Sequence, residues 1–71
     1  MAEDVRAHIT GVVFQIVAAS GSRVAAGDPI LILESMKMEI PVEAPRAGVV
    51  RELRVSEGQT VQEGEVVATL E

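Results

Sequence analysis

The chain contains the same segment twice, and this internal repeat is the feature that most restricts how it can fold. Adding 37 to any position from Val5 to Glu34 gives its partner between Val42 and Glu71, with no insertion or deletion. Ten of the thirty pairs are identical, namely Val5/Val42, Ala7/Ala44, Gly11/Gly48, Val12/Val49, Val13/Val50, Gly21/Gly58, Val24/Val61, Gly27/Gly64, Leu33/Leu70 and Glu34/Glu71. Each copy has too few residues to bury its own apolar face, so we expect the copies to pack on each other about an approximate two-fold axis.

Short aliphatic runs separated by glycine give the pattern of an all-β domain with tight turns. No window keeps a 3.6-residue period long enough to predict a helix. The expected strands are Val5–Ile9, Gly11–Ala18, Ile30–Glu34, Met38–Glu43, Gly48–Val55 and Val66–Leu70. Two small antiparallel sheets that face one another are the simplest arrangement that buries both copies.

Each copy also contains the motif Gly-x-x-Val-x-x-Gly followed by an acidic residue, at Gly21–Asp28 and at Gly58–Glu65. The motif predicts a loop whose glycines take backbone angles that other residues avoid. The central valines, Val24 and Val61, are expected to point inward. We assign structural turns to six glycines, which are Gly11, Gly21, Gly27, Gly48, Gly58 and Gly64.

Length and composition favour one small domain that spans residues 1–71. The chain has no cysteine and one histidine, so we expect neither a disulfide nor a metal site. Eleven acidic residues outnumber six scattered basic ones, which argues against a nucleic-acid groove. No apolar run approaches the roughly twenty residues that a bilayer requires, and the acidic N-terminus differs from a secretory signal. These features fit a protein of the cytoplasm.

The segment Ser35–Pro41 connects the two copies, and it contains Lys37, the only lysine of the chain. A hairpin between the flanking strands would place Lys37 at its tip, in solvent. A two-residue turn at Met36 and Lys37 conflicts with the preference of such turns for Asn-Gly or Asp-Gly, unless the loop is longer. Poor turn formers at a turn often have a functional reason, so Lys37 is the candidate functional residue.

The methionines beside Lys37 and the single phenylalanine each have two interpretations. Met36 and Met38 are deformable and suit an apolar groove on an enzyme that recognises the lysine, although both could instead fill the core. We favour recognition. Phe14, the only aromatic residue, is expected either in the core or as a single exposed apolar side chain. No cluster of acid, base and nucleophile is present, so we expect no catalytic residue.

The segment Glu34–Pro41 reads Glu-Ser-Met-Lys-Met-Glu-Ile-Pro and resembles the biotin attachment sequence of biotin carboxyl carrier proteins and biotinyl domains. The similarity continues through Val42–Val50, which matches Val-x-Ala-Pro-x-x-Gly-x-Val, and through the Gly58–Gly64 loop. It therefore covers essentially the whole chain from Val5 to Glu71.

This resemblance implies a flattened barrel-sandwich hybrid of two four-stranded antiparallel sheets with internal pseudo-two-fold symmetry. It implies that biotin protein ligase attaches biotin covalently to Lys37. The residues assigned to ligase recognition are Glu34, Ser35, Met36, Met38 and Glu39. Glu34 and Glu39 could instead be ordinary exposed charges, and the recurrence of Glu34 as Glu71, where no lysine follows, favours a structural role for it. The chain would then be a non-catalytic carrier, which ferries a carboxyl group as carboxybiotin between the biotin carboxylase and carboxyltransferase subunits of a biotin-dependent carboxylase.

Two alternatives stay open. A lipoyl carrier shares the fold and the modified hairpin lysine, but lipoyl sites usually read Asp-Lys-Ala, whereas Lys37 lies between Met36 and Met38. An unmodified barrel-sandwich interaction module would use the same scaffold with an ordinary turn at Lys37.

Overall fold

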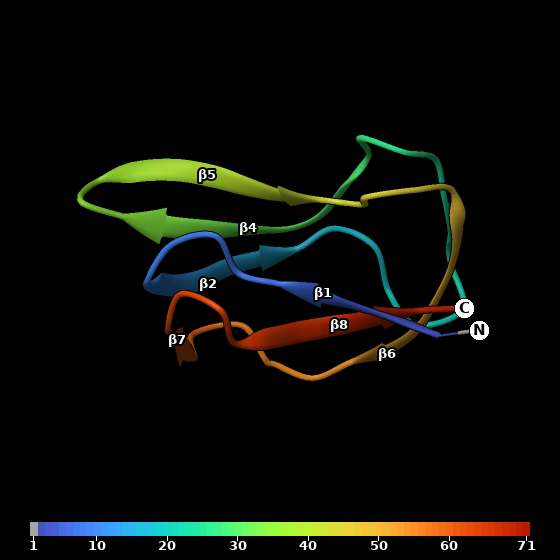
Figure 1. Ribbon diagram of the computed structural model, residues 1–71. Coiled ribbons are helices and arrows are strands. Elements are labelled where there is room, and N and C mark those ends of the chain that lie inside the picture. The colour runs from blue at the N-terminus through green and yellow to red at the C-terminus, as the bar shows by residue number, and fades with distance from the viewer. Residues whose placement is uncertain (1) are drawn as a thin grey trace.

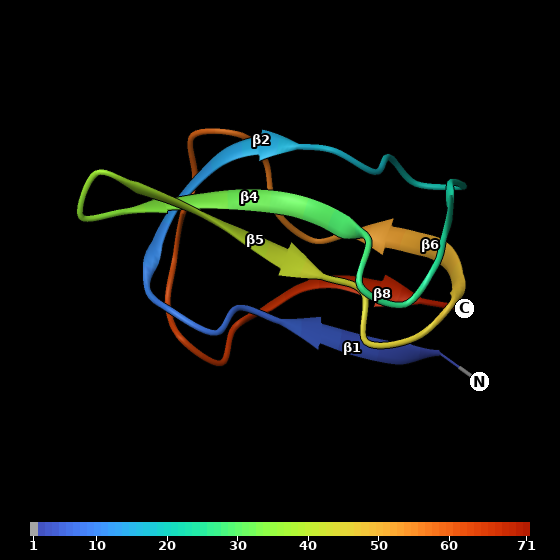
Figure 2. The same ribbon diagram turned by 90° about the horizontal axis from the view of Figure 1, so that it is seen from above.

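The computed structural model describes residues 2–71, which form eight β-strands in two antiparallel sheets. The strands are β1 (Glu3–Arg6), β2 (Gly11–Ile16), β3 (Arg23–Val24), β4 (Pro29–Ser35), β5 (Met38–Glu43), β6 (Gly48–Leu53), β7 (Thr60–Val61) and β8 (Val66–Leu70). The sheet orders are β1-β8-β6-β3 and β5-β4-β2-β7, so the predicted all-β class with two four-stranded antiparallel sheets is confirmed. Figure 1 and Figure 2 show the two chain ends together at one end of the molecule. No helix able to cross a membrane occurs among residues 2–71.

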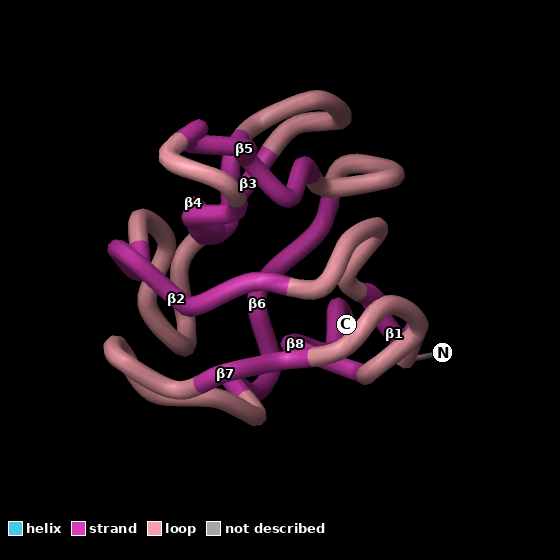
Figure 3. Tube along the Cα trace, turned by 90° about the vertical axis from the view of Figure 1, so that its left-hand side faces the viewer, coloured by secondary structure: helices cyan, strands magenta, loops and turns pink. Residues whose placement is uncertain are grey.

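The two sheets follow the internal repeat. A shift of 37 residues moves β2 onto β6 and β3 onto β7, and it moves β4 onto β8. The edge strands β1 and β5 take equivalent places, so the two sheets have the same order. Each sheet combines two strands from each copy, and Figure 3, viewed from the hairpin end, shows strands of both copies around one interior. Neither copy can therefore complete a sheet without the other.

Two strands are missing from the sequence-based prediction. β3 and β7 have two residues each and lie inside the Gly-x-x-Val-x-x-Gly loops, where no alternation of side chains can be recognised. β3 pairs with β6 and β7 pairs with β2, so each loop extends a sheet built around the other copy. The first strand also starts earlier than expected, at Glu3 instead of Val5, and ends at Arg6, where its register with β8 shifts.

Aliphatic side chains from both sheets form one core. Its buried members are Val5, Ala7, Val13, Ala18, Val24, Ile30, Leu31, Leu33, Val42, Ala44, Val50, Val55, Val61, Val67, Ala68 and Leu70. The valines at the centres of the two glycine loops belong to this set, as the motif predicts. Equivalent residues of the two copies are buried alike, since Leu33 and Leu70 are both 0 % exposed. The core therefore belongs to both copies equally.

The glycines divide into two structural groups. Four loop glycines have φ between 88° and 91°, in agreement with the expected turns; these are Gly21, Gly27, Gly58 and Gly64. Gly11 and Gly48 do not lie in turns, contrary to the prediction, because they begin β2 and β6. A Cβ at Gly11 would lie 2.7 Å from the carbonyl oxygen of Glu34, and one at Gly48 would lie 2.8 Å from that of Glu71. Glycine is required at both positions because the neighbouring backbone passes so close.

Candidate functional site

The hairpin of β4 and β5 projects from the end of the molecule opposite to the chain termini (Figure 1 and Figure 2). Its strands pair from Pro29 opposite Glu43 to Ser35 opposite Met38. Only Met36 and Lys37 remain between the last paired residues, and both are exposed. The predicted position of Lys37, at a solvent-facing hairpin tip, is therefore confirmed.

The turn holds Met36 and Lys37 in the left-handed region, with φ of 53° and 65°. A positive φ at both central positions is the backbone of a type I′ two-residue hairpin turn, so the tight turn is present and the longer loop is not. The left-handed conformation costs about 1 kcal/mol for each residue that carries a Cβ. Strain at an exposed turn without any packing benefit points to a role outside folding.

Both methionines lie in solvent beside the lysine. Met36 is 91 % exposed and Met38 is 62 % exposed, which excludes the interpretation that they fill the core. Met38 shares one side of β5 with Ile40 and Val42, but it lies beyond the part of the strand that the core covers. The amine at the apex is therefore flanked by two accessible and deformable apolar side chains.

Acidic side chains lie at the base of the turn. Glu34 and Glu39 are paired across the hairpin and both are exposed, while Ser35, opposite Met38, is partly buried. Within the described range 2–71, neither of these glutamates forms an ion pair. Lys37 is thus the single cation of a hairpin that otherwise carries carboxylates.

Gly11 supports the hairpin from the neighbouring strand, which the sequence did not reveal. The site of its missing side chain lies 2.7 Å from the Glu34 carbonyl oxygen and 3.4 Å from the Cβ of Ser35. β2 can therefore pack closely against the last residues of β4 before the turn. The only sequence signal for this close packing is that both copies have glycine at this position, Gly11 and Gly48. A glycine shared by the two copies is explained equally well by a turn.

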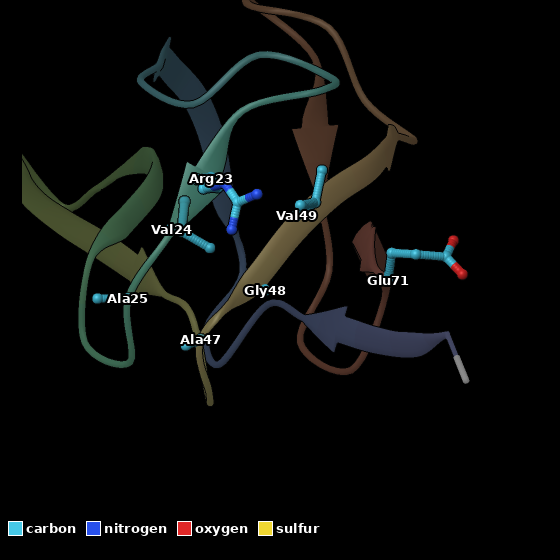
Figure 4. A pocket seen from close by; sticks show the side chains of 7 residues that line it. All are labelled: Arg23, Val24, Ala25, Ala47, Gly48, Val49 and Glu71. Carbon is cyan, nitrogen blue, oxygen red and sulfur yellow. The ribbon is translucent and has the colours of Figure 1, made fainter.

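A hollow of the described surface lies away from this site. Figure 4 shows it between β3 and the start of β6, and its lining residues are Arg23, Val24, Ala25, Ala47, Gly48, Val49 and Glu71. This end of the molecule carries the chain termini, whereas the hairpin tip lies at the other end (Figure 1). Among residues 2–71 there is also no group of three or more metal-ligating side chains. The apex of the hairpin is therefore the candidate site.

Known proteins match both the sequence and the fold over most of the length of this chain. The family model described as "Biotin-requiring enzyme" matches residues 1–70. The chain is 47 % identical to "Biotinylated protein TB7.3 homolog" of Mycobacterium leprae, and the alignment covers 99 % of each chain. It is 42 % identical to "Biotin carboxyl carrier protein of acetyl-CoA carboxylase" of Solanum lycopersicum, over 82 % of this chain and 83 % of that protein. The crystal structure of urea carboxylase from Kluyveromyces lactis matches with a TM-score of 0.94 and 37 % identity, covering 99 % of this chain and 6 % of that one.

Proposed function

Because this chain belongs to the family described as "Biotin-requiring enzyme", we propose that it is a biotin carboxyl carrier that holds biotin covalently on Lys37. The observation that carries the proposal is the place of Lys37, since the only side-chain primary amine stands at the apex of a projecting two-residue turn. An amide to biotin requires an accessible amine and no enclosed pocket, and the exposed apex meets that requirement. When bound, biotin supplies a ureido ring that takes up and releases a carboxyl group.

Attachment needs an enzyme because a lysine amine is protonated at neutral pH and is then not a nucleophile. In the proposed reaction, biotin protein ligase supplies biotinyl-adenylate and removes one proton from Lys37 Nζ before the attack and a second proton from the same nitrogen as the amide forms. The nitrogen lone pair attacks the acyl carbon, an amide bond forms, and the acyl bond to the adenylate oxygen breaks with release of AMP. The projecting hairpin orients the amine for this attack without unfolding of the carrier.

We propose that the ligase recognises the side chains around the apex. Met36 and Met38 can enter an apolar groove because they are exposed and adapt their shape easily. The paired carboxylates at the base of the turn can bind basic groups beside that groove. The full proposed recognition set is Glu34, Ser35, Met36, Met38 and Glu39.

The proposed role after attachment is tethering, and catalysis belongs to the partner subunits. Residues 1–71 would act as one carrier domain, supported by the single core that both copies share. A covalent tether can hold a reactive group near an enzyme site at an effective concentration on the order of millimolar. Transfer between a biotin carboxylase and a carboxyltransferase would then require no free diffusion of the carried group.

Mass spectrometry of the intact protein tests the proposed function. The wild-type chain is co-expressed once with biotin protein ligase and once with a lipoyl ligase, each with its cofactor supplied. An increment of one biotinyl group supports the proposal. A lipoyl increment alone would assign the chain to the lipoyl carriers, and an unmodified chain in both cultures would assign it to interaction modules.

The Met36→Gly substitution should separate the stability of the turn from its recognition. Glycine relieves the left-handed strain but adds freedom to the unfolded chain, so the free energy of unfolding should rise by between zero and about 1 kcal/mol. The kcat/KM of biotinylation should nevertheless fall about tenfold because the side chain that the ligase reads is lost. Urea denaturation and initial-rate kinetics measure the two effects.

The matched control is Met36→Leu, which keeps an apolar side chain in the same strained backbone. It should leave stability unchanged and retain most of the biotinylation efficiency. If the kcat/KM of biotinylation is the same for Met36→Gly as for the wild type, the proposed recognition of Met36 by the ligase is wrong.

A further inference from the structure

The outer face of the sheet β5-β4-β2-β7 has no role in the attachment reaction as described so far. We call it the hairpin face and define it by Val12, Phe14, Ile32, Glu34, Glu39 and Pro41. Val13 and Leu33 point into the core, so the residues next to them on β2 and β4 point outward. The hairpin face is therefore the solvent side of the sheet that ends in the Lys37 turn.

Phe14 belongs to this face because of an irregularity in β2. The register between β2 and β4 shifts between Val13 and Gln15, so Phe14 is an extra residue next to Gln15, which pairs with Ile32. Phe14 is 49 % exposed, and Val12, two residues earlier, is 38 % exposed. Phe14 is thus not a core residue, and the alternative interpretation of an exposed apolar side chain is confirmed.

The residues of the second copy that are equivalent to Phe14 and to the nearby Val17 are charged and paired. Adding 37 to Phe14 gives Arg51, whose Nε lies 3.4 Å from Glu71 Oε2. Adding 37 to the exposed Val17 gives Arg54, which forms an ion pair of 3.8 Å with the neighbouring Glu52. Such exposed pairs are typical of a solvated surface. The position of Phe14 therefore carries a paired arginine in the second copy and an exposed aromatic side chain in the first.

The hairpin face also has carboxylates without a basic partner. Glu34 is the equivalent of Glu71, but Phe14 stands where its arginine would be. Between residues 2 and 71, no ion pair involves Glu34 or Glu39, and the strands of this sheet contain no arginine. A complementary surface would present an apolar hollow bordered by arginine or lysine.

The hairpin face is continuous with the apex. Val12 lies opposite Glu34, which precedes Lys37 by three residues, or about 10 Å along an extended strand. A specific interface covers about 800 Å² of each partner, which is about a fifth of the 4310 Å² surface of this molecule. An enzyme that encloses Lys37 with an interface of that size must extend onto a side of the hairpin. The hairpin face is the side that combines apolar exposure with unpaired charge.

We propose that the hairpin face is the docking surface for the ligase that acylates Lys37, with Phe14 as its main contact outside the turn. This inference rests on the proposed function and extends the recognition set from the apex onto β2. Phe14 fills an apolar hollow of the ligase, and basic groups beside that hollow pair with Glu34 and Glu39. Aromatic anchors of this kind often provide most of the binding energy of an interface.

The test is the kinetics of biotinylation by purified ligase, at saturating biotin and ATP, with the carrier as the varied substrate. Phe14→Arg should lower kcat/KM at least tenfold, mainly through a higher KM, because the aromatic contact is lost and a cation meets the basic groups of the ligase. Arg51→Ala, at the equivalent position of the other sheet, should leave kcat/KM within about twofold of the wild type. The structure has arginine at the equivalent position 51, so Phe14→Arg should fold, and thermal melting checks this.

Phe14→Ala adds no charge and should also lower kcat/KM. If thermal melting shows that Phe14→Arg is destabilised, Phe14→Ala takes its place in the test.

The outcomes distinguish this inference from the proposed function. A wild-type chain that accepts biotin, together with a folded Phe14 variant of unchanged kcat/KM, overturns the docking surface alone. A wild-type chain that accepts no biotin overturns both. Slower carboxylation of the biotinylated variant with normal ligase kinetics would assign the face to the carboxylase instead. A dimer of the wild type that dissociates in the variant would assign it to a second copy, and either result overturns docking of the ligase.

Discussion

Replacing Lys37 with arginine is expected to abolish biotin incorporation completely and to leave the fold unchanged. Arginine keeps the positive charge, but its guanidinium stays protonated and does not attack an acyl-adenylate. The side chain stands at an exposed apex, so the free energy of unfolding should change by less than about 0.5 kcal/mol. Intact mass after co-expression with biotin protein ligase measures incorporation, and thermal melting measures stability.

A second variant tests whether the position matters as well as the amine. In the Lys37→Arg background, Arg54→Lys supplies one exposed lysine directly after the end of β6, away from the Lys37 turn. We expect no biotin on this double variant, because the new amine lacks the strained apex and the flanking methionines. Biotin on the new lysine would show that exposure alone suffices, and biotin on the single Lys37→Arg variant would refute Lys37 as the acceptor.

The location of the site was predictable because two independent signals in the sequence agree. Aliphatic runs on both sides of Ser35–Pro41 predict a hairpin, and the repeat isolates that same segment as the connection between the copies. The backbone of the turn could not be predicted, since neither methionine nor lysine favours the left-handed conformation found at Met36 and Lys37. The pairing of Ser35 with Met38 imposes that conformation from outside the turn.

The repeat does not predict which strands pair to form each sheet. Periodicity identifies the longer strands, but it does not say that each sheet takes two strands from each copy. β3 and β7 depend entirely on their partners, since two residues have no sequence pattern of their own. The role of Gly11 likewise depends on the close approach of β2 to the backbone of Glu34, which the sequence does not show.

The sequence left open whether Phe14 is buried or exposed. An extra residue in β2 shifts the alternation of inward and outward side chains, and no sequence signal marks that shift. Once the structure places Phe14 outside, the repeat becomes informative again, because it identifies Arg51 as the residue at the same place on the other sheet. The comparison of the two copies then separates features needed for folding, which both share, from features found in one copy only.

Loss of a buried leucine from either copy is expected to destabilise the whole domain by the same large amount. Leu33 and Leu70 occupy equivalent positions and are both 0 % exposed. Leu33→Ala and Leu70→Ala should each lower the free energy of unfolding by about 3 kcal/mol, through lost burial and the cavity left behind. For 71 residues, the total is typically only about 4–10 kcal/mol, so either variant should lose a large part of its stability.

Urea denaturation followed by circular dichroism measures both variants, and the slope of the transition shows whether the domain still unfolds as one unit. We expect a single transition in each case, because every sheet contains strands of both copies and neither can unfold alone. Gln15→Ala, an exposed substitution on β2, is the control and should change the free energy of unfolding by less than about 0.5 kcal/mol. Two separate transitions in Leu70→Ala, with the Lys37 hairpin intact in the intermediate, would show that the copies fold independently. The hairpin would then be presented by half of the molecule, and the shared core would not be needed to hold the acceptor lysine in place.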